Sequence, residues 1–125
     1  MTSKVYFTDF KVRGGENLTG KLKRLIKAAG FDSIDMENKF TAIKMHFGEK
    51  GNLSFLRPNY ARAIVDMVYE KDGKPFLTDC NTMYPGSRKN AIEHLYCAWE
   101  NGFTPMTVNC PVIIGDGLKG TDDIE

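Results

Sequence analysis

Apolar and polar residues alternate with strand and helix periods along most of the chain. Runs of alternating side chains predict strands at Lys4–Phe10, at residues 42–47, at Pro75–Asp79 and at Val108 with Val112–Ile114. Helical spacing of apolar residues separates these runs, and alternating strands and helices favour right-handed crossovers and a parallel sheet. The sequence therefore predicts an α/β fold, with a mostly parallel four-stranded sheet flanked by helices in a three-layer βαβ arrangement.

Capping residues define three predicted helices. Asn17 is expected to cap the first helix and Gly30 to end it in a left-handed turn. Pro58 suits the first position of the second helix. Ser87 is expected to cap the third helix, which Gly102 ends, and its apolar face comprises Ala91, Ile92, Leu95, Tyr96, Ala98 and Trp99. His94, Tyr96 and Trp99 are expected to be packing residues.

Length and charge limit the classes of function. The 125 residues, 42% of them hydrophobic, suit a single domain spanning residues 1–125. Seventeen basic and sixteen acidic residues nearly cancel, which disfavours binding to nucleic acid or to an anionic membrane. No apolar run approaches the roughly 20 residues of a membrane span. A small molecule or another protein is therefore the expected partner.

The cysteines indicate a reducing compartment. Cys80, Cys97 and Cys110 are odd in number, widely spaced and without a CxxC pair, and the opening MTSKVYF lacks the apolar core of a signal peptide. We therefore expect a cytoplasmic protein with free thiols.

The strand predicted at residues 42–47 contains a candidate site. Lys44 and His46 share one face of the strand predicted at residues 42–47, because side chains alternate with period two. His46 is the last polar residue before Gly48, and open α/β sheets bind ligands at the carboxyl ends of their strands. A binding site and a structural pair, with the lysine extending to the rim beside a core histidine, are both compatible with this pattern.

The ends of the four predicted strands carry Asp9, His46, Asp79 and Asp116. In a parallel sheet these residues lie along one edge, although aspartate after a strand is also a common turn residue. Arg57 precedes the second helix, and Arg88 with Lys89 falls in the predicted first turn of the third, where the helix dipole disfavours cations. A bound anion would offset these charges. The candidate ligand-binding residues are Lys44, His46, Arg57, Asp79, Asn81, Arg88 and Asp116.

Other chemistries have weaker support. A divalent metal such as zinc, iron or nickel would use His46, Glu49, Asp79 and Cys80, but their spacing is not a recognised metal signature. Gly14 and Gly15 lack a GxGxxG or Walker pattern, and Ser87 lacks the GxSxG elbow of a nucleophile. No catalytic residue is assigned.

Long motifs carry a family resemblance. They are KMHFGEKGNLSFLRPNYA, FLTDCNTMYPGSRKNAIEHL, WENGF and VIIGDGLKG. They resemble the amino-terminal part of the domain of unknown function 362 family, the uncharacterised iron-sulfur centre proteins. The resemblance implies an α/β domain and, in longer relatives, a ferredoxin-type segment whose cysteines hold iron-sulfur clusters. This chain ends at Glu125 before such a segment, and its cysteine spacing matches no cluster motif.

The resulting functional prediction is a cytoplasmic domain that binds an anionic small molecule or a metal at its strand ends, in a redox context. The alternative is a non-catalytic interaction or oligomerisation module without its own cofactor. No helix is predicted after Val112–Ile114, so part of the sheet is expected to stay exposed. We therefore expect either a homo-oligomer burying at least about 1,000 Å² or a missing carboxyl-terminal half.

Overall fold

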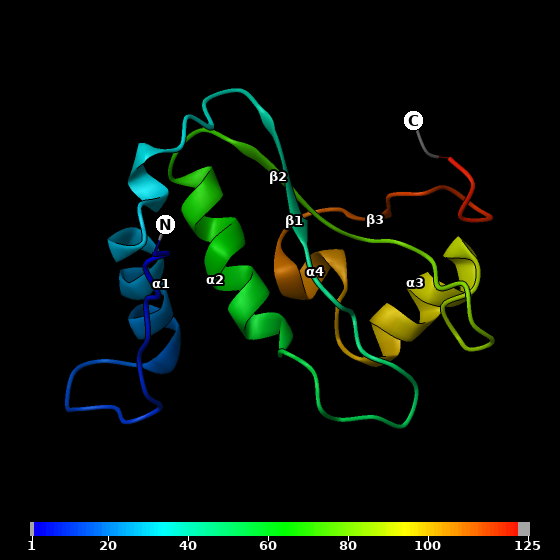
Figure 1. The fold of residues 1–125 in the computed structure, drawn as a ribbon, viewed down its shortest axis with the longest axis horizontal. Coiled ribbons are helices and arrows are strands. Elements are labelled where there is room, and N and C mark those ends of the chain that lie inside the picture. The colour runs from blue at the N-terminus through cyan, green and yellow to red at the C-terminus, as the bar shows by residue number, and fades with distance from the viewer. Residues whose placement is uncertain (1, 123–125) are drawn as a thin grey trace.

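A three-stranded parallel sheet lies at the centre of an α/β fold in the computed structural model, which describes residues 2–122 (Figure 1). The strands follow the order β1-β2-β3. The elements are α1 (Leu18–Ala28), η1 (Phe31–Ser33), β1 (Phe40–Lys44), α2 (Pro58–Tyr69), β2 (Lys74–Asp79), α3 (Ala91–Glu100), α4 (Pro105–Val108) and β3 (Val112–Ile114).

The strand register places the loops after the three strands at one edge of the sheet. Lys44 lies beside Thr78, and Asp79 lies beside Ile114. Both strand pairs are parallel, which confirms the predicted parallel sheet. The carboxyl ends of β1, β2 and β3 therefore meet, and the residues that follow them are brought close together.

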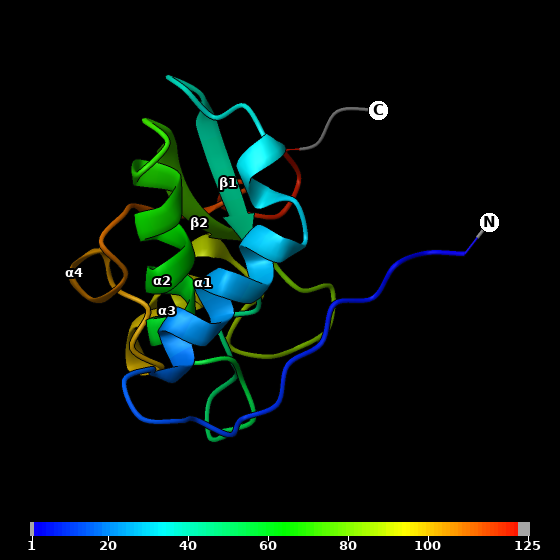
Figure 2. The same ribbon diagram turned by 90° about the vertical axis from the view of Figure 1, so that its left-hand side faces the viewer.

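The predicted first strand is wrong, so the sheet has three strands rather than four. Residues 4–10 form no regular element, and Val5 and Phe7 are 88% and 85% exposed. Figure 2 shows the first residues of the chain extending away from the helices. The carboxylate of Asp9 is instead bound by Lys21 of α1, at 2.5 Å. This side-chain contact fixes the segment beside α1, where its apolar side chains gain no burial.

Helices flank the sheet as predicted, but α2 and α3 contact it through the same face and α1 and α4 pack against α2, so the predicted three-layer arrangement is wrong. Leu77 and Ile114 point to this face and share a core with residues of α2 and α3. The buried core comprises Phe47, Ala61, Val65, Leu77, Ala91, Ala98, Phe103, Val108, Cys110 and Ile114. In the order β1-β2-β3, two right-handed crossovers running in the same direction place both connecting helices on the same side.

The opposite face is uncovered by the described residues. Phe40 and Ala42 of β1 and Ile113 of β3 point to it and are exposed. This face of the sheet therefore exposes apolar side chains, in line with the expectation that part of the sheet stays exposed. Pairing of this face with a second copy stays a prediction.

Local capping chemistry explains the helix boundaries. The Asn17 side chain accepts a hydrogen bond from the Gly20 N–H, Gly30 has a φ of 105°, and Pro58 begins α2, all as predicted. The third helix begins later than predicted, because Asn90 is its cap and accepts from the Glu93 N–H. Ser87 precedes this cap and has a different role, described below.

The buried face of α3 consists of small residues and a histidine. Ala91, His94, Cys97 and Ala98 are buried, whereas Tyr96 and Trp99 form an exposed edge-to-face pair with ring centroids 5.2 Å apart. The prediction that the two aromatic residues belong to the core is wrong. Alanine and cysteine let the helix approach the sheet closely, which leaves the bulky side chains on the outer side.

None of the helices in residues 2–122 has both the length and the apolar character that crossing a membrane requires.

Candidate functional site

Ionisable side chains gather at the carboxyl edge of the sheet. We call Lys44, Glu49, Asp79, Arg88 and His94 the edge cluster. Lys44 ends β1, Asp79 ends β2, Glu49 and Arg88 lie on the loops that follow these strands, and His94 projects from α3. Asp79 and Arg88 are each 4% exposed and His94 is fully buried. Buried charges are expensive unless they are paired, so the contacts within the cluster determine its stability.

Asp79 is the centre of the edge cluster. Its Oδ1 accepts from the Cys80 N–H at 2.9 Å and lies 3.1 Å from Lys44 Nζ. Its Oδ2 lies 3.6 Å from His94 Nε2 and 3.7 Å from Arg88 Nη1, beyond ordinary hydrogen-bond length. Burial raises the pKa of Asp79, but His94, Lys44 and the Cys80 N–H outweigh burial and hold the pKa at about 2.

Glu49 joins the loop after β1 to the loop after β2. Its carboxylate accepts from the Ser87 hydroxyl and, at 3.0 Å, from Arg88 Nε. Arg88 also donates through Nη2 to the Tyr84 hydroxyl at 2.5 Å. The Ser87 hydrogen bond lowers the pKa of Glu49 most, burial opposes it, and Arg88 lowers it further, to about 2. Ser87 therefore stabilises a carboxylate rather than capping a helix.

The two depressed pKa values predict a loss of stability in acid. The ordinary values are 4.5 for Glu49 and 3.8 for Asp79, and both fall to about 2 in the folded protein. A carboxylate whose pKa is lower in the folded than in the unfolded protein stabilises the fold at pH values above its unfolded pKa. This stabilisation is lost as the pH falls from about 4.5 towards 2. We expect about 2 kcal/mol of loss for each carboxylate, measured by urea unfolding at pH 7 and pH 2.5.

A matched variant separates this effect from general acid destabilisation. Glu49→Gln is expected to remove about half of the pH dependence, whereas Glu100→Gln, which alters the exposed Lys50–Glu100 pair, is expected to leave it unchanged. Equal pH dependence in wild type and Glu49→Gln would contradict the assigned role of Glu49.

His46 presents a hydrogen-bond donor two residues after the end of β1. Its ring is exposed, and its Nδ1 accepts from the Gly48 N–H at 2.9 Å. Burial lowers the pKa of His46, and the charge of Arg88 lowers it further against the opposing effect of Asp79. The neutral ring is thus favoured at pH 7, and with Nδ1 accepting, its proton resides on Nε2. Because its ring is exposed, His46 is not the core histidine of the alternative structural interpretation.

Gly48 is required for this geometry. Its φ is 85°, and a Cβ at this position would lie 2.5 Å from Asn101 Nδ2. Asn101 Nδ2 in turn donates to the Phe47 carbonyl at 2.9 Å. A left-handed backbone conformation and a crowded neighbour both demand glycine here. The turn that aims the Gly48 N–H at His46 is therefore specified by the sequence.

The remaining predicted ligand-binding residues lie outside the edge cluster. Asp116 accepts from the Asn81 backbone N–H at 3.0 Å and from Asn81 Nδ2 at 3.1 Å, so this pair links the loops after β2 and β3. Arg57 is exposed at the cap position of α2 and forms no ion pair with the described residues. Their roles as ligand-binding residues stay predictions.

The helix-dipole argument for Arg88 and Lys89 is wrong, because both residues precede the Asn90 cap and neither lies in the first turn of α3. The charge of Arg88 is instead balanced by Glu49 and Asp79. The two neighbouring carboxylates therefore account for the buried charge of Arg88, and no anion at a helix start is needed to balance it.

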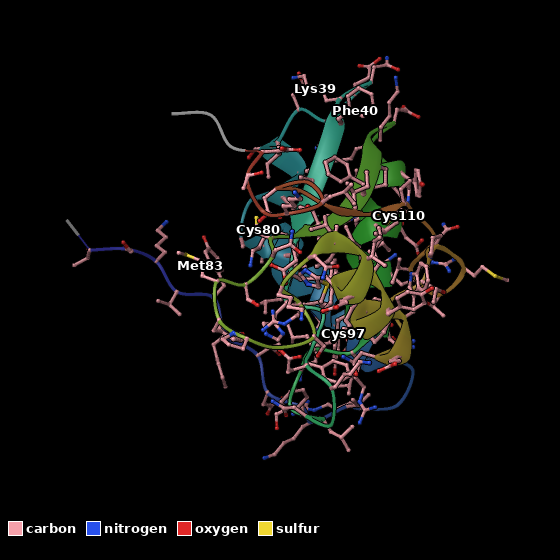
Figure 3. The ribbon with its side chains drawn as sticks, turned by 90° about the vertical axis from the view of Figure 1, so that its right-hand side faces the viewer. Lys39, Phe40, Cys80, Met83, Cys97 and Cys110 are labelled. Carbon is pink, nitrogen blue, oxygen red and sulfur yellow. The ribbon has the colours of Figure 1, made fainter. Side chains whose placement is uncertain are left out.

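No group of three His, Cys, Asp or Glu side chains in residues 2–122 is arranged to hold a metal ion. The carboxylates of Glu49 and Asp79 are directed at cations and N–H donors instead. The three cysteines are free, with Cys80 exposed and the other two buried, and Figure 3 shows them at separate places. Metal binding by His46, Glu49 and Asp79 stays a prediction.

Comparison with known proteins identifies one family. The family model described as Domain of unknown function (DUF362) matches residues 41–125, more than half of the chain. The match begins within β1 and includes the whole edge cluster. Neither the curated proteins nor the solved structures contain a match to this chain. The iron-sulfur context, the oligomeric state and the cytoplasmic location stay predictions.

Proposed function

We propose that this chain, which belongs to the DUF362 family, binds a small anionic molecule at the carboxyl edge of its sheet. Lys44 and His46 are the binding groups. Asp79 of the edge cluster holds the Lys44 ammonium, the Gly48 N–H holds the His46 ring, and Arg88 balances the charge of the carboxylates. The carboxyl edge of an open parallel sheet is also where α/β folds generally bind ligands.

The observation that carries the proposal is a pair of exposed donors, one on the last residue of β1 and one two residues after it. The Lys44 ammonium has three protons and forms an ion pair with Asp79 Oδ1, 3.1 Å away. The Lys44 side chain is 67% exposed, so its other protons are free to bind a ligand. His46, two residues further along the chain, adds an Nε2–H donor, because its Nδ1 accepts from the Gly48 N–H. A carboxylate or phosphate group has the size and charge to accept from both.

Asp79 and Gly48 prearrange these donors before a ligand arrives. Asp79 holds the Lys44 ammonium in an ion pair, and the Gly48 N–H fixes the His46 tautomer. A neutral histidine donor also avoids placing a third cation beside Lys44 and Arg88. The two side chains therefore lose less conformational freedom when a ligand binds, which favours affinity.

Replacing Lys44 tests the proposal. Lys44→Met is expected to weaken the binding of inorganic phosphate at pH 7 at least about tenfold, because a charge-assisted hydrogen bond is lost. Isothermal titration calorimetry at low ionic strength measures the dissociation constant.

The matched control is Lys74→Met. Lys74 points to the same face from the other end of β2 and lies 5.5 Å from the Phe40 ring. This variant is expected to bind phosphate as the wild type does. Equal weakening in both variants, or no weakening in Lys44→Met, would show that phosphate binding depends on overall charge or on other residues.

A further inference from the structure

We infer that the bound anion is amphipathic: its anionic group binds at Lys44, and its apolar part enters the cavity that Lys44 shares with β1, α1 and α2. The inference rests on the proposed function and adds the chemical class of the ligand. A short aliphatic or aromatic carboxylate has this character.

The cavity has a volume of about 340 Å³, within the range of small-molecule pockets. It lies between residues 8–10, α1, the end of β1 and α2. Its walls are predominantly apolar, with Leu22 from α1, Ile43 and Met45 from β1 and Ile64 from α2 among the lining side chains. An apolar wall of this kind favours hydrocarbon and disfavours a polar ligand such as a sugar.

The cavity exists because β1 is the edge strand of the sheet. Thr8, Asp9 and Phe10 line its far side without pairing with β1. The space that a fourth strand would fill is therefore left open beside an apolar sheet edge. A ligand in this space would bury apolar surface that the folded chain leaves accessible.

The charges at the cavity wall determine the orientation of the ligand. Lys21 also lines the cavity, but its Nζ donates to Asp9 Oδ1 at 2.5 Å and to the Lys11 carbonyl at 2.7 Å. Lys44 is the more accessible cation, with a side chain 67% exposed compared with 11% for Lys21. The anionic group is thus expected at Lys44, beside His46, and the apolar part towards Leu22 and Ile64.

A series of carboxylates tests the inference. Acetate, butanoate, hexanoate and octanoate are titrated into the full chain, and calorimetry gives each dissociation constant. Affinity is expected to rise about fourfold with each methylene that enters the cavity. In methyl NMR spectra, octanoate is expected to shift the signals of Leu22, Ile43 and Ile64 and to leave those of Ile113 and Leu118, outside the lining, unchanged.

Two controls distinguish failure of the inference from failure of the proposed function. If phosphate binds in a Lys44-dependent manner but affinity is the same from acetate to octanoate, the apolar part of the inference is wrong and the proposed function stands. If octanol binds as tightly as octanoate and Lys44→Met binds both as the wild type does, Lys44 is not an anion site. That result would overturn the inference and the proposed function together.

Discussion

Replacing Arg88 with methionine is expected to lower the free energy of unfolding by about 3–5 kcal/mol, the loss typical when one partner of a buried ion pair is removed. The Arg88 side chain is 5% exposed, and it lies 3.0 Å from Glu49 and 3.7 Å from Asp79. Methionine fills much of the same space but leaves two carboxylates without their shared cation. Urea unfolding at pH 7 measures the change.

The control for Arg88 is an arginine in an exposed ion pair. Arg62 lies 3.0 Å from Asp66, one turn along α2, and its side chain is 42% exposed. Arg62→Met is expected to lose only about 0.3–0.5 kcal/mol. A loss below about 1 kcal/mol for Arg88→Met would mean that the edge cluster does not depend on this arginine.

Replacing Phe47 with alanine is expected to lower the free energy of unfolding by about 3–5 kcal/mol, as is usual for a buried phenylalanine. Phe47 is fully buried, and its ring centroid lies 5.3 Å from that of Phe103 and 5.8 Å from that of His94. The substitution therefore leaves a cavity beside His94 of the edge cluster. Thermal and urea unfolding both report the loss.

Phe40 at the start of β1 is the matched control, because it is 82% exposed on the uncovered face. Phe40→Ala is expected to change stability by less than about 0.5 kcal/mol. A loss for Phe40→Ala comparable with that for Phe47→Ala would show that the uncovered face is packed against something in solution, such as a second copy.

Local signals predict most of the sheet and the helix starts. Asn17 and Pro58 act through their immediate neighbours in sequence, so their effects on α1 and α2 are visible in the sequence. Apolar alternation likewise locates β2, where Leu77 and Asp79 are buried on one face. The parallel arrangement follows from the order of strands and helices.

The failures arise from interactions that local patterns do not reveal. The segment at residues 4–10 has strand alternation, but Asp9 binds Lys21 and the segment does not join the sheet. Ser87 is as good a cap as Asn90, and its hydrogen bond to Glu49, 38 residues earlier, decides between them. The single covered face depends on strand order, which alternation alone does not specify.

The candidate site is predictable in part for the same reason. Lys44, His46 and Asp79 follow from the rule that parallel strands end at one edge. The participation of His94 was missed, although its spacing of three and four residues from Ala91 and Ala98 places it on the buried face of α3. The Glu49–Arg88 pair has no sequence signal, because it joins two loops 39 residues apart.

The binding of an anion at Lys44 and His46 is tested most directly by backbone and imidazole ¹⁵N NMR of the wild-type chain titrated with inorganic phosphate at pH 7. Saturable shifts at Lys44, His46 Nε2 and Gly48, without shifts at Lys74 or Phe40, are the predicted result. No shift of the His46 Nε2 signal would contradict a ligand site at the carboxyl edge of the sheet. Equal shifts at all exposed lysines would contradict it as well.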